Sequence, residues 1–167
     1  AYAAIDYEGI EVLNDVFGGV TVQVLEDLTF VNPALQEGKI VTLDGQQAHS
    51  YVWSRNIEEL DSNNMRKTRQ KQYMMAFVQK TVEATKVDVN VPLKLYQAAS
   101  NYMVTNVSIA KVTYLVSKVL NIGIADVWTV SVPGEVVKGE IYAKFIPNEE
   151  KLYELILDIF YTKVNNS

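Results

Sequence analysis

Cysteine is absent from this chain of 167 residues, and histidine occurs only once. Without a thiol the chain has no disulfide framework, no cysteine nucleophile and no thiolate zinc site. A single histidine argues equally against a histidine-rich metal centre. No apolar run reaches the roughly 18 residues that a membrane-spanning helix needs. These absences exclude several classes of enzyme and direct attention to the charged residues.

Basic residues are outnumbered, with 15 Lys and Arg against 20 Asp and Glu, giving a net charge of −5. Because phosphate neutralisation needs a basic surface, we expect no nucleic-acid partner. Apolar residues make up 49% of the chain and charged residues 21%, which is a globular composition. The length suits one core, so the sequence predicts a single domain over residues 1–167.

The hydrophobic pattern predicts strands mixed with helices along the whole chain. We interpret this as an α/β fold, a mixed β-sheet covered by helices on both faces. A strand–helix–strand start is compatible with a βαβ unit, although parallel pairing does not follow from the pattern. Predicted strands are 1–6, 20–25, 127–132 and 140–146, the last two around a turn at Pro133-Gly134. Predicted helices are 8–17, 44–53, 64–85, one opening at Pro92, 107–120 and one capped by Asn148, with 26–42 a polar connection.

Arginine is used in one place only. Arg55, Arg66 and Arg69 fall within 15 residues of one another, whereas lysine serves the rest of the chain. The planar guanidinium forms bidentate hydrogen bonds with phosphate and keeps its charge. Arg66, Arg69 and Gln70 share one face of the long predicted helix, near its N-terminus, where free backbone N–H groups favour an anion. The cluster therefore indicates a site for phosphate or carboxylate.

A solvated helix start remains the alternative for this segment. In that interpretation the arginines pair with Glu58, Glu59 and Asp61 and face water, as most charge runs do. The lone His49 is expected to have a packing or surface role. The acidic residues form no recognisable run of metal ligands, so we predict no metal site within this chain.

Two motifs carry a resemblance to a known family. The run Leu43 to Arg55, LDGQQAHSYVWSR, followed by Asp61 and by RKTRQ at 66–70, resembles the LytR-CpsA-Psr (LCP) family pattern "LnGeqALaYvRxR", acidic loop, "RxxRQ". Flanking segments are also similar: DYEG at 6–9, VFGGVTV at 16–22 and FIPNEEKL at 145–152. The resemblance covers essentially the whole chain and corresponds to the C-terminal part of the catalytic domain.

The resemblance implies a cell-envelope transferase. LCP proteins stand on the outer face of the cytoplasmic membrane of Gram-positive bacteria. They move phosphate-linked glycopolymers, such as teichoic acid or capsule, from a polyprenyl-pyrophosphate lipid to peptidoglycan. Mg²⁺ assists in the intact family domain, and its ligands are not expected in this chain. The parent protein is expected to be membrane-anchored.

The resemblance also assigns roles to residues. Arg55, Arg66 and Gln70 become the catalytic, pyrophosphate-binding positions, and Arg69 and Trp53 join them in binding substrate. The prenyl tail is expected in an apolar tunnel, although ordinary core packing is the alternative for each candidate residue. The tunnel candidates are Ile10, Leu13, Phe17, Met74, Phe77 and Val78.

Two departures from the family pattern shape the hypothesis. Trp53 stands where the family has the first arginine of its pair, which removes one phosphate contact. The first half of the family domain, with its metal-binding aspartates, is not in this sequence, so we expect a catalytically incomplete, N-terminally truncated domain that self-associates or lacks a partner segment. Alternatives are a non-catalytic module that binds polyprenyl phosphate or anionic glycopolymer, and a regulatory or scaffold protein.

Overall fold

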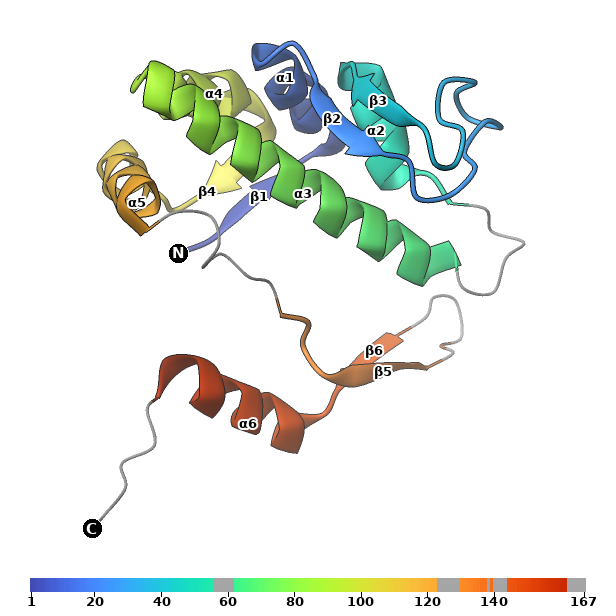
Figure 1. The fold of residues 1–167 in the computed structure, drawn as a ribbon. Helices are drawn as coiled ribbons and strands as arrows, with labels where there is room; N and C mark the ends of the chain where they lie inside the picture. Colours follow the sequence, from blue (N-terminus) through green and yellow to red (C-terminus); the bar gives the residue numbers. More distant parts are fainter. Residues whose placement is uncertain (56–61, 123–129, 138, 140–143, 162–167) are drawn as a thin grey trace. The chain divides into compact units, whose positions relative to one another are not determined.

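The computed structural model describes residues 1–55, 62–122, 130–137, 139 and 144–161. The chain divides into two compact units, residues 1–126 and residues 127–167. Along the chain (Figure 1), the first unit contains β1 (Ala3–Ile5), α1 (Tyr7–Val16), β2 (Val20–Gln23), β3 (Ile40–Leu43), α2 (Gly45–Trp53), α3 (Ser62–Val87), α4 (Val91–Ala99), a 3₁₀ turn η1 (Ser100–Tyr102), β4 (Met103–Thr105) and α5 (Ile109–Ile122). The second contains β5 (Gly134–Val137), β6 (Lys144–Pro147) and α6 (Glu149–Phe160).

Strand pairing differs from the sequence-based expectation. The described strands form three separate antiparallel pairs, β1–β4, β2–β3 and β5–β6, in place of one mixed sheet. The βαβ start is also wrong, because β1 pairs with β4 and β2 pairs with β3. The chain after β2 turns back on itself, so β3 lies beside β2 as an antiparallel neighbour, and Thr21 and Thr42 share a hydroxyl hydrogen bond of 2.8 Å. The α/β class is confirmed, but the prediction of one mixed β-sheet is wrong.

Two short strands were missed, and each has a local reason. β3 begins near the end of the predicted polar connection 26–42 and runs one residue beyond it, and its four residues are too few for a clear alternation. β4 has three residues between α4 and α5. Such strands depend on a distant partner for their hydrogen bonds, which local pattern does not reveal. The first unit therefore contains two strands that the sequence pattern did not predict.

The helix α1 is fixed at both ends. Asp6 caps its start by accepting from the Gly9 amide at 2.8 Å. Beyond its end, Gly18 and Gly19 take φ of +68° and +100°, the left-handed values that glycine adopts without strain. The predicted stop at these glycines is confirmed. A side chain at Gly19 would also place its Cβ against the backbone carbonyl oxygen of Leu43.

The helix α2 begins at a complete capping box, and its predicted extent is confirmed. The carboxylate of Asp44 accepts from the Gln47 amide at 2.8 Å, and the Gln47 side chain accepts from the Asp44 amide at 3.1 Å. Reciprocal bonds of this kind satisfy two amides that the helix itself leaves unpaired. Gly45 lies next, buried against α1.

The long helix α3 organises the first unit. It contacts α2, β2, α4 and α5 along its length, and Figure 1 shows it running past each of them. Its predicted extent of 64–85 is confirmed within two residues at either end. Among the described residues no helix is both long and apolar enough to cross a bilayer. The core beside α3 contains Val20, Val22, Val24, Leu28, Leu35, Leu43, Ala48, Tyr51, Val52 and Tyr73.

The described residues of the second unit form an antiparallel strand pair and a helix. The predicted turn at Pro133-Gly134 is wrong, because β5 begins at Gly134 and pairs with β6. Residues 130–132 are not strand, while 127–129 and 140–143 lie outside the described residues. The helix capped by Asn148 is confirmed, since the Asn148 side chain accepts from the Lys151 amide at 3.0 Å. No residue of α6 is buried.

Candidate functional site

The C-terminal end of α2 is tied to α3 by two side chains. The guanidinium of Arg69 donates to the backbone carbonyls of Tyr51 and Ser54. The amide of Gln70 donates to the carbonyl of Val52 at 3.0 Å. The last carbonyls of a helix have no hydrogen-bond partner within the helix and carry partial negative charge. A guanidinium at this end both donates hydrogen bonds to these carbonyls and balances their charge. The segment that leads to Arg55 is thereby held in place.

Arg69 has no exposed surface. Its Nε lies 2.7 Å from a carboxylate oxygen of Glu26, and its guanidinium lies 5.5 Å from the ring centroid of Tyr51. Burial lowers the pKa of Arg69, and the charge of Glu26 opposes that shift. Burial likewise raises the pKa of Tyr51. Both terminal nitrogens of Arg69 donate to backbone carbonyls and its Nε is ion-paired with Glu26, so direct contact of this buried arginine with substrate stays a prediction.

Arg66 and Arg55 are the accessible arginines of the cluster. Arg66 is half-buried and donates from one terminal nitrogen to Asn63 at 3.0 Å. Its Nε is buried and has no hydrogen-bond partner among the described residues. Arg55 is exposed and directly follows the carbonyl that Arg69 holds. The acidic residues of the alternative interpretation, at positions 58, 59 and 61, lie outside the described residues.

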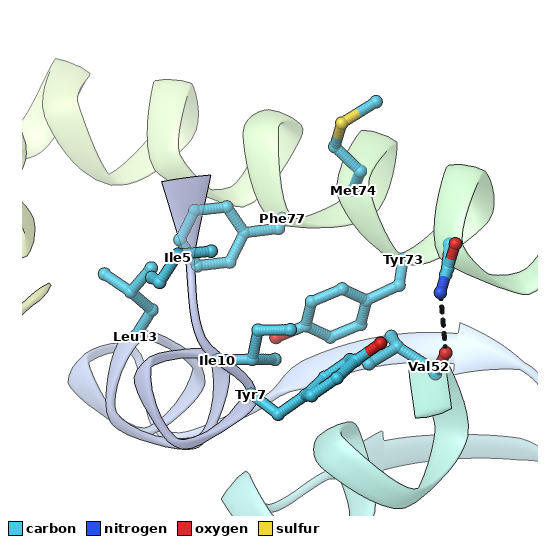
Figure 2. Close-up of a pocket in the computed structure, with 9 residues that line it drawn as sticks. Ile5, Tyr7, Ile10, Leu13, Val52, Tyr73, Met74 and Phe77 are labelled. Carbon is cyan, nitrogen blue, oxygen red and sulfur yellow. Dashed lines mark hydrogen bonds between the residues drawn. The ribbon is translucent and has the colours of Figure 1, made fainter. Parts of the chain in front are cut away.

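An apolar cavity of about 270 Å³ opens beside this cluster. Side chains from α1 face side chains from α3 across it (Figure 2). At its edge Gln70 donates to the Val52 carbonyl. Gln70 lies one helical turn after Arg66, so the polar cluster adjoins the cavity wall. Burial raises the pKa of Tyr73. The wall is formed by Ile5, Tyr7, Ile10, Leu13, Val52, Gln70, Tyr73, Met74 and Phe77.

Four of the six tunnel candidates line this cavity: Ile10, Leu13, Met74 and Phe77. Met74 is 43% exposed, and in Figure 2 its side chain points away from the facing rings. Val78 lines a second cavity, described below. Phe17 lines neither, but its ring contacts Phe77 at a centroid distance of 5.6 Å.

Sequence reasoning missed the aromatic and acidic residues around the cluster. Glu26, the partner of Arg69, lies in the predicted polar connection, and Tyr7 and Tyr73 were not singled out. Trp53 is 54% exposed, and its ring meets the edge of His49. His49 in turn stacks on Tyr7, and its Nδ1 lies 2.5 Å from Glu11, so the lone histidine has a packing role here. The one available signal was the spacing of Tyr73 from Gln70 and Phe77.

The LytR_cpsA_psr family matches residues 1–156 of the chain, from the first strand into α6. The chain belongs to the LCP family. No curated protein matches it significantly.

Solved structures of similar fold agree with LCP membership. The Lin1025 protein from Listeria innocua is 26% identical, with 92% of this chain and 65% of that chain covered and a TM-score of 0.64. TagV from B. subtilis is 20% identical, with 97% and 65% covered and a TM-score of 0.67. TagT, solved bound to LI-WTA, is 20% identical, with 93% and 57% covered and a TM-score of 0.66. The chain therefore spans less than two thirds of each of these relatives.

The Mg²⁺ that the LCP resemblance implies finds no cluster of ligands here. Among the described residues no three His, Asp or Glu side chains lie close enough together to hold a metal ion. Asp6 caps α1 and Glu11 contacts His49, so these acids already have partners. The described residues do not fit a magnesium centre.

Proposed function

We propose that this LCP chain binds the pyrophosphate and the prenyl tail of a polyprenyl-pyrophosphate-linked glycopolymer, as part of a phosphotransferase that delivers the polymer to peptidoglycan. The observation that carries the proposal is the junction of Arg66 with the cavity. Arg66, whose buried Nε has no hydrogen-bond partner among the described residues, lies one turn from Gln70, which is part of the wall of an apolar cavity. An amphiphile with an anionic head and a hydrocarbon tail suits this junction.

The arginines that would bind the pyrophosphate lie beside the apolar cavity that would bind the prenyl tail, and this arrangement suits phosphoryl transfer. Phosphoryl transfer depends on positioning and on stabilising negative charge, and guanidinium groups do both. Arg55 and Arg66 would hold the pyrophosphate, and Gln70 would contact it at the cavity wall. Arg69 would act as a positioning residue, since it fixes the carbonyls that precede Arg55. TagT, of similar fold, was solved with LI-WTA bound, which supports a ligand of this class.

Location and partners belong to the same proposal. A donor carried on a polyprenyl lipid and an acceptor in the cell wall meet at the outer face of the cytoplasmic membrane. We therefore place the parent protein there, in a Gram-positive bacterium. The acceptor hydroxyl of peptidoglycan would attack the phosphorus that carries the glycopolymer. Polyprenyl phosphate would leave with the bridging oxygen and the electron pair of the broken P–O bond, and it would take up the proton that the hydroxyl loses.

A non-catalytic binding module is the second candidate, and Trp53 favours it. Where the family pattern has an arginine, this chain presents an exposed indole that packs on His49 and brings no charge. Transfer activity of the parent protein separates the two candidates. Transfer of a lipid-linked glycopolymer by this chain alone, in the absence of metal, would contradict the expectation that it is catalytically incomplete.

Binding of geranyl pyrophosphate tests the site, with Arg66→Ala and Lys67→Ala as a matched pair. Both substitutions remove one positive charge from the same turn of α3, but Lys67 is exposed. We expect Arg66→Ala to cost about 1.5–3 kcal/mol of binding free energy, which is roughly 10- to 150-fold in Kd, as for lost hydrogen bonds between charged groups. Lys67→Ala should change Kd by less than about threefold. Calorimetry that gave equal Kd values for Arg66→Ala and the unmodified chain would remove the assignment.

A further inference from the structure

A second apolar cavity, of about 240 Å³, lies between α3, α4 and α5. It shares one residue with the first cavity, and that residue is Phe77. None of the site roles assigned above uses α4 or α5. The wall consists of Phe77, Val78, Thr81, Val82, Thr85, Pro92, Val112, Leu115, Val116 and Leu120.

The two cavities follow each other along one helix. On α3 the first cavity is lined from Gln70 to Phe77 and the second from Phe77 to Thr85. Steps of three and four residues join these positions, so they form a continuous stripe. At 1.5 Å per residue the stripe is about 22 Å long, roughly 10 Å of it before Phe77 and 12 Å after. A linear ligand that enters beside Gln70 would meet the second cavity only after passing Phe77.

The second cavity suits hydrocarbon in spite of its two threonines. The hydroxyl of Thr81 donates to the carbonyl of Phe77 at 2.8 Å, and that of Thr85 donates to the carbonyl of Thr81 at 2.6 Å. Each hydroxyl is thus satisfied by its own helix, and the remaining wall is aliphatic or aromatic. Burial of further hydrocarbon there would strengthen binding in proportion to the area covered.

The ring of Phe77 makes two aromatic contacts. Its centroid lies 5.6 Å from that of Phe17 and 6.3 Å from that of Tyr73. The ring is half-buried and packs against the core, so rotating it away disturbs aromatic contacts on two elements.

We propose that Phe77 separates two segments of one prenyl-binding channel and thereby sets how much of the tail this chain engages, with the cavity between α3, α4 and α5 as the distal segment. The inference rests on the proposed function. It extends that function to a second cavity and to one residue that limits the length of prenyl tail bound. A tail that ends before Phe77 occupies the first cavity alone. Longer tails reach the α4–α5 cavity only when the ring yields.

Calorimetric titration with geranyl, farnesyl and geranylgeranyl pyrophosphate tests the partition. In the unmodified chain we expect Kd to change by less than about threefold across the series, because carbons beyond Phe77 remain outside the channel. In Phe77→Ala the longest compound should bind at least about tenfold tighter than the shortest, because its distal carbons enter the second cavity. Phe77→Leu keeps apolar packing with a shorter side chain, and it decides the question if the alanine variant does not fold by circular dichroism.

Filling the second cavity provides the control. Leu115 is 53% exposed at its rim, so Leu115→Trp can block the cavity without replacing a buried side chain. Leu115→Trp in the Phe77→Ala background should abolish the gain for the longest compound and leave geranyl pyrophosphate unaffected. If Leu115→Trp instead changes the oligomeric state of the protein in solution, the second cavity is an interface between copies and the proposal is overturned.

The remaining outcomes separate this inference from the proposed function. If geranyl pyrophosphate does not bind the unmodified chain, the proposed function fails and the partition fails with it. If it binds, and both Phe77 variants keep the length dependence of the unmodified chain, only the partition is overturned.

Discussion

At the scale of single residues, the three arginines have three different surroundings. Arg69 is fully buried at the C-terminal end of α2 and is ion-paired with Glu26. Arg66 is half-buried, and Arg55 is exposed to solvent. The sequence grouped them by type and spacing, and the structure divides the group into one buried arginine and two accessible ones. A buried guanidinium with carbonyl and carboxylate partners is costly to unpair, because its neighbours lose their partners too.

Arg69→Ala is expected to lower the free energy of unfolding by about 3–5 kcal/mol, the range for breaking one partner out of a buried ion pair. The carbonyls of Tyr51 and Ser54 would lose their donor, and Glu26 would lose its counter-charge. Urea denaturation followed by circular dichroism measures the loss. Lys71→Ala, at an exposed position of the same helix, is the control and should stay within about 0.5 kcal/mol. A fully stable Arg69→Ala protein would show that the arginine does not hold α2.

At the scale of elements, close contact between α1 and α2 places Tyr7 beside His49 and forms one wall of the first cavity. Gly45 permits this contact. A Cβ there would lie 2.9 Å from the backbone carbonyl oxygen of Glu11 and 2.7 Å from a carboxylate oxygen of Asp15. The side chain of Asp15 can move, whereas the backbone of α1 moves only with the helix.

Gly45→Ala should therefore push α1 and α2 apart and cost about 1–2 kcal/mol of stability, in the range for overpacking. The usual gain from replacing glycine in a helix would offset only part of this loss. Gln46→Ala changes the neighbouring, exposed position of α2 and should be neutral. Thermal unfolding of the two variants makes the comparison. An unchanged or raised melting temperature for Gly45→Ala would mean that the helices have room to adjust.

At the scale of the whole molecule, the two units differ in how much they bury. The core residues Val20, Leu43 and Tyr51 lie in the first unit, whereas no residue of α6 is buried. The exposed apolar side chains of α6 include Ile156, Leu157 and Phe160. Self-association or a missing partner segment stays a prediction.

Backbone amides of α6 should exchange with deuterium at least about tenfold faster than amides in the middle of α3. An element without buried side chains opens with a smaller free energy than one packed on a core. Exchange followed by mass spectrometry at several protein concentrations measures both helices in one sample. Protection of α6 equal to that of α3, independent of concentration, would contradict this. Protection that rises with concentration would support self-association.

Local pattern predicted the helices well, because their signals are local. Asp44 with Gln47, the glycines after α1 and Asn148 are caps that act within a few residues, and each was confirmed. Strand pairing was predicted poorly, because β3 and β4 depend on partners far along the chain. The cluster of Arg66, Arg69 and Gln70 on one helix face followed from helical geometry alone, whereas the burial of Arg69 did not.

The amino-acid order by itself determined where the helices begin and end, which residues share a face of α3, and the family to which the chain belongs. These properties arise from interactions within a few residues or from residue identity. Only the tertiary structure decided that Arg69 faces inward, that Glu26 neutralises it and that Phe77 stands between two cavities. Those outcomes depend on which distant segments pack together, since burial and pairing are set by neighbours in space.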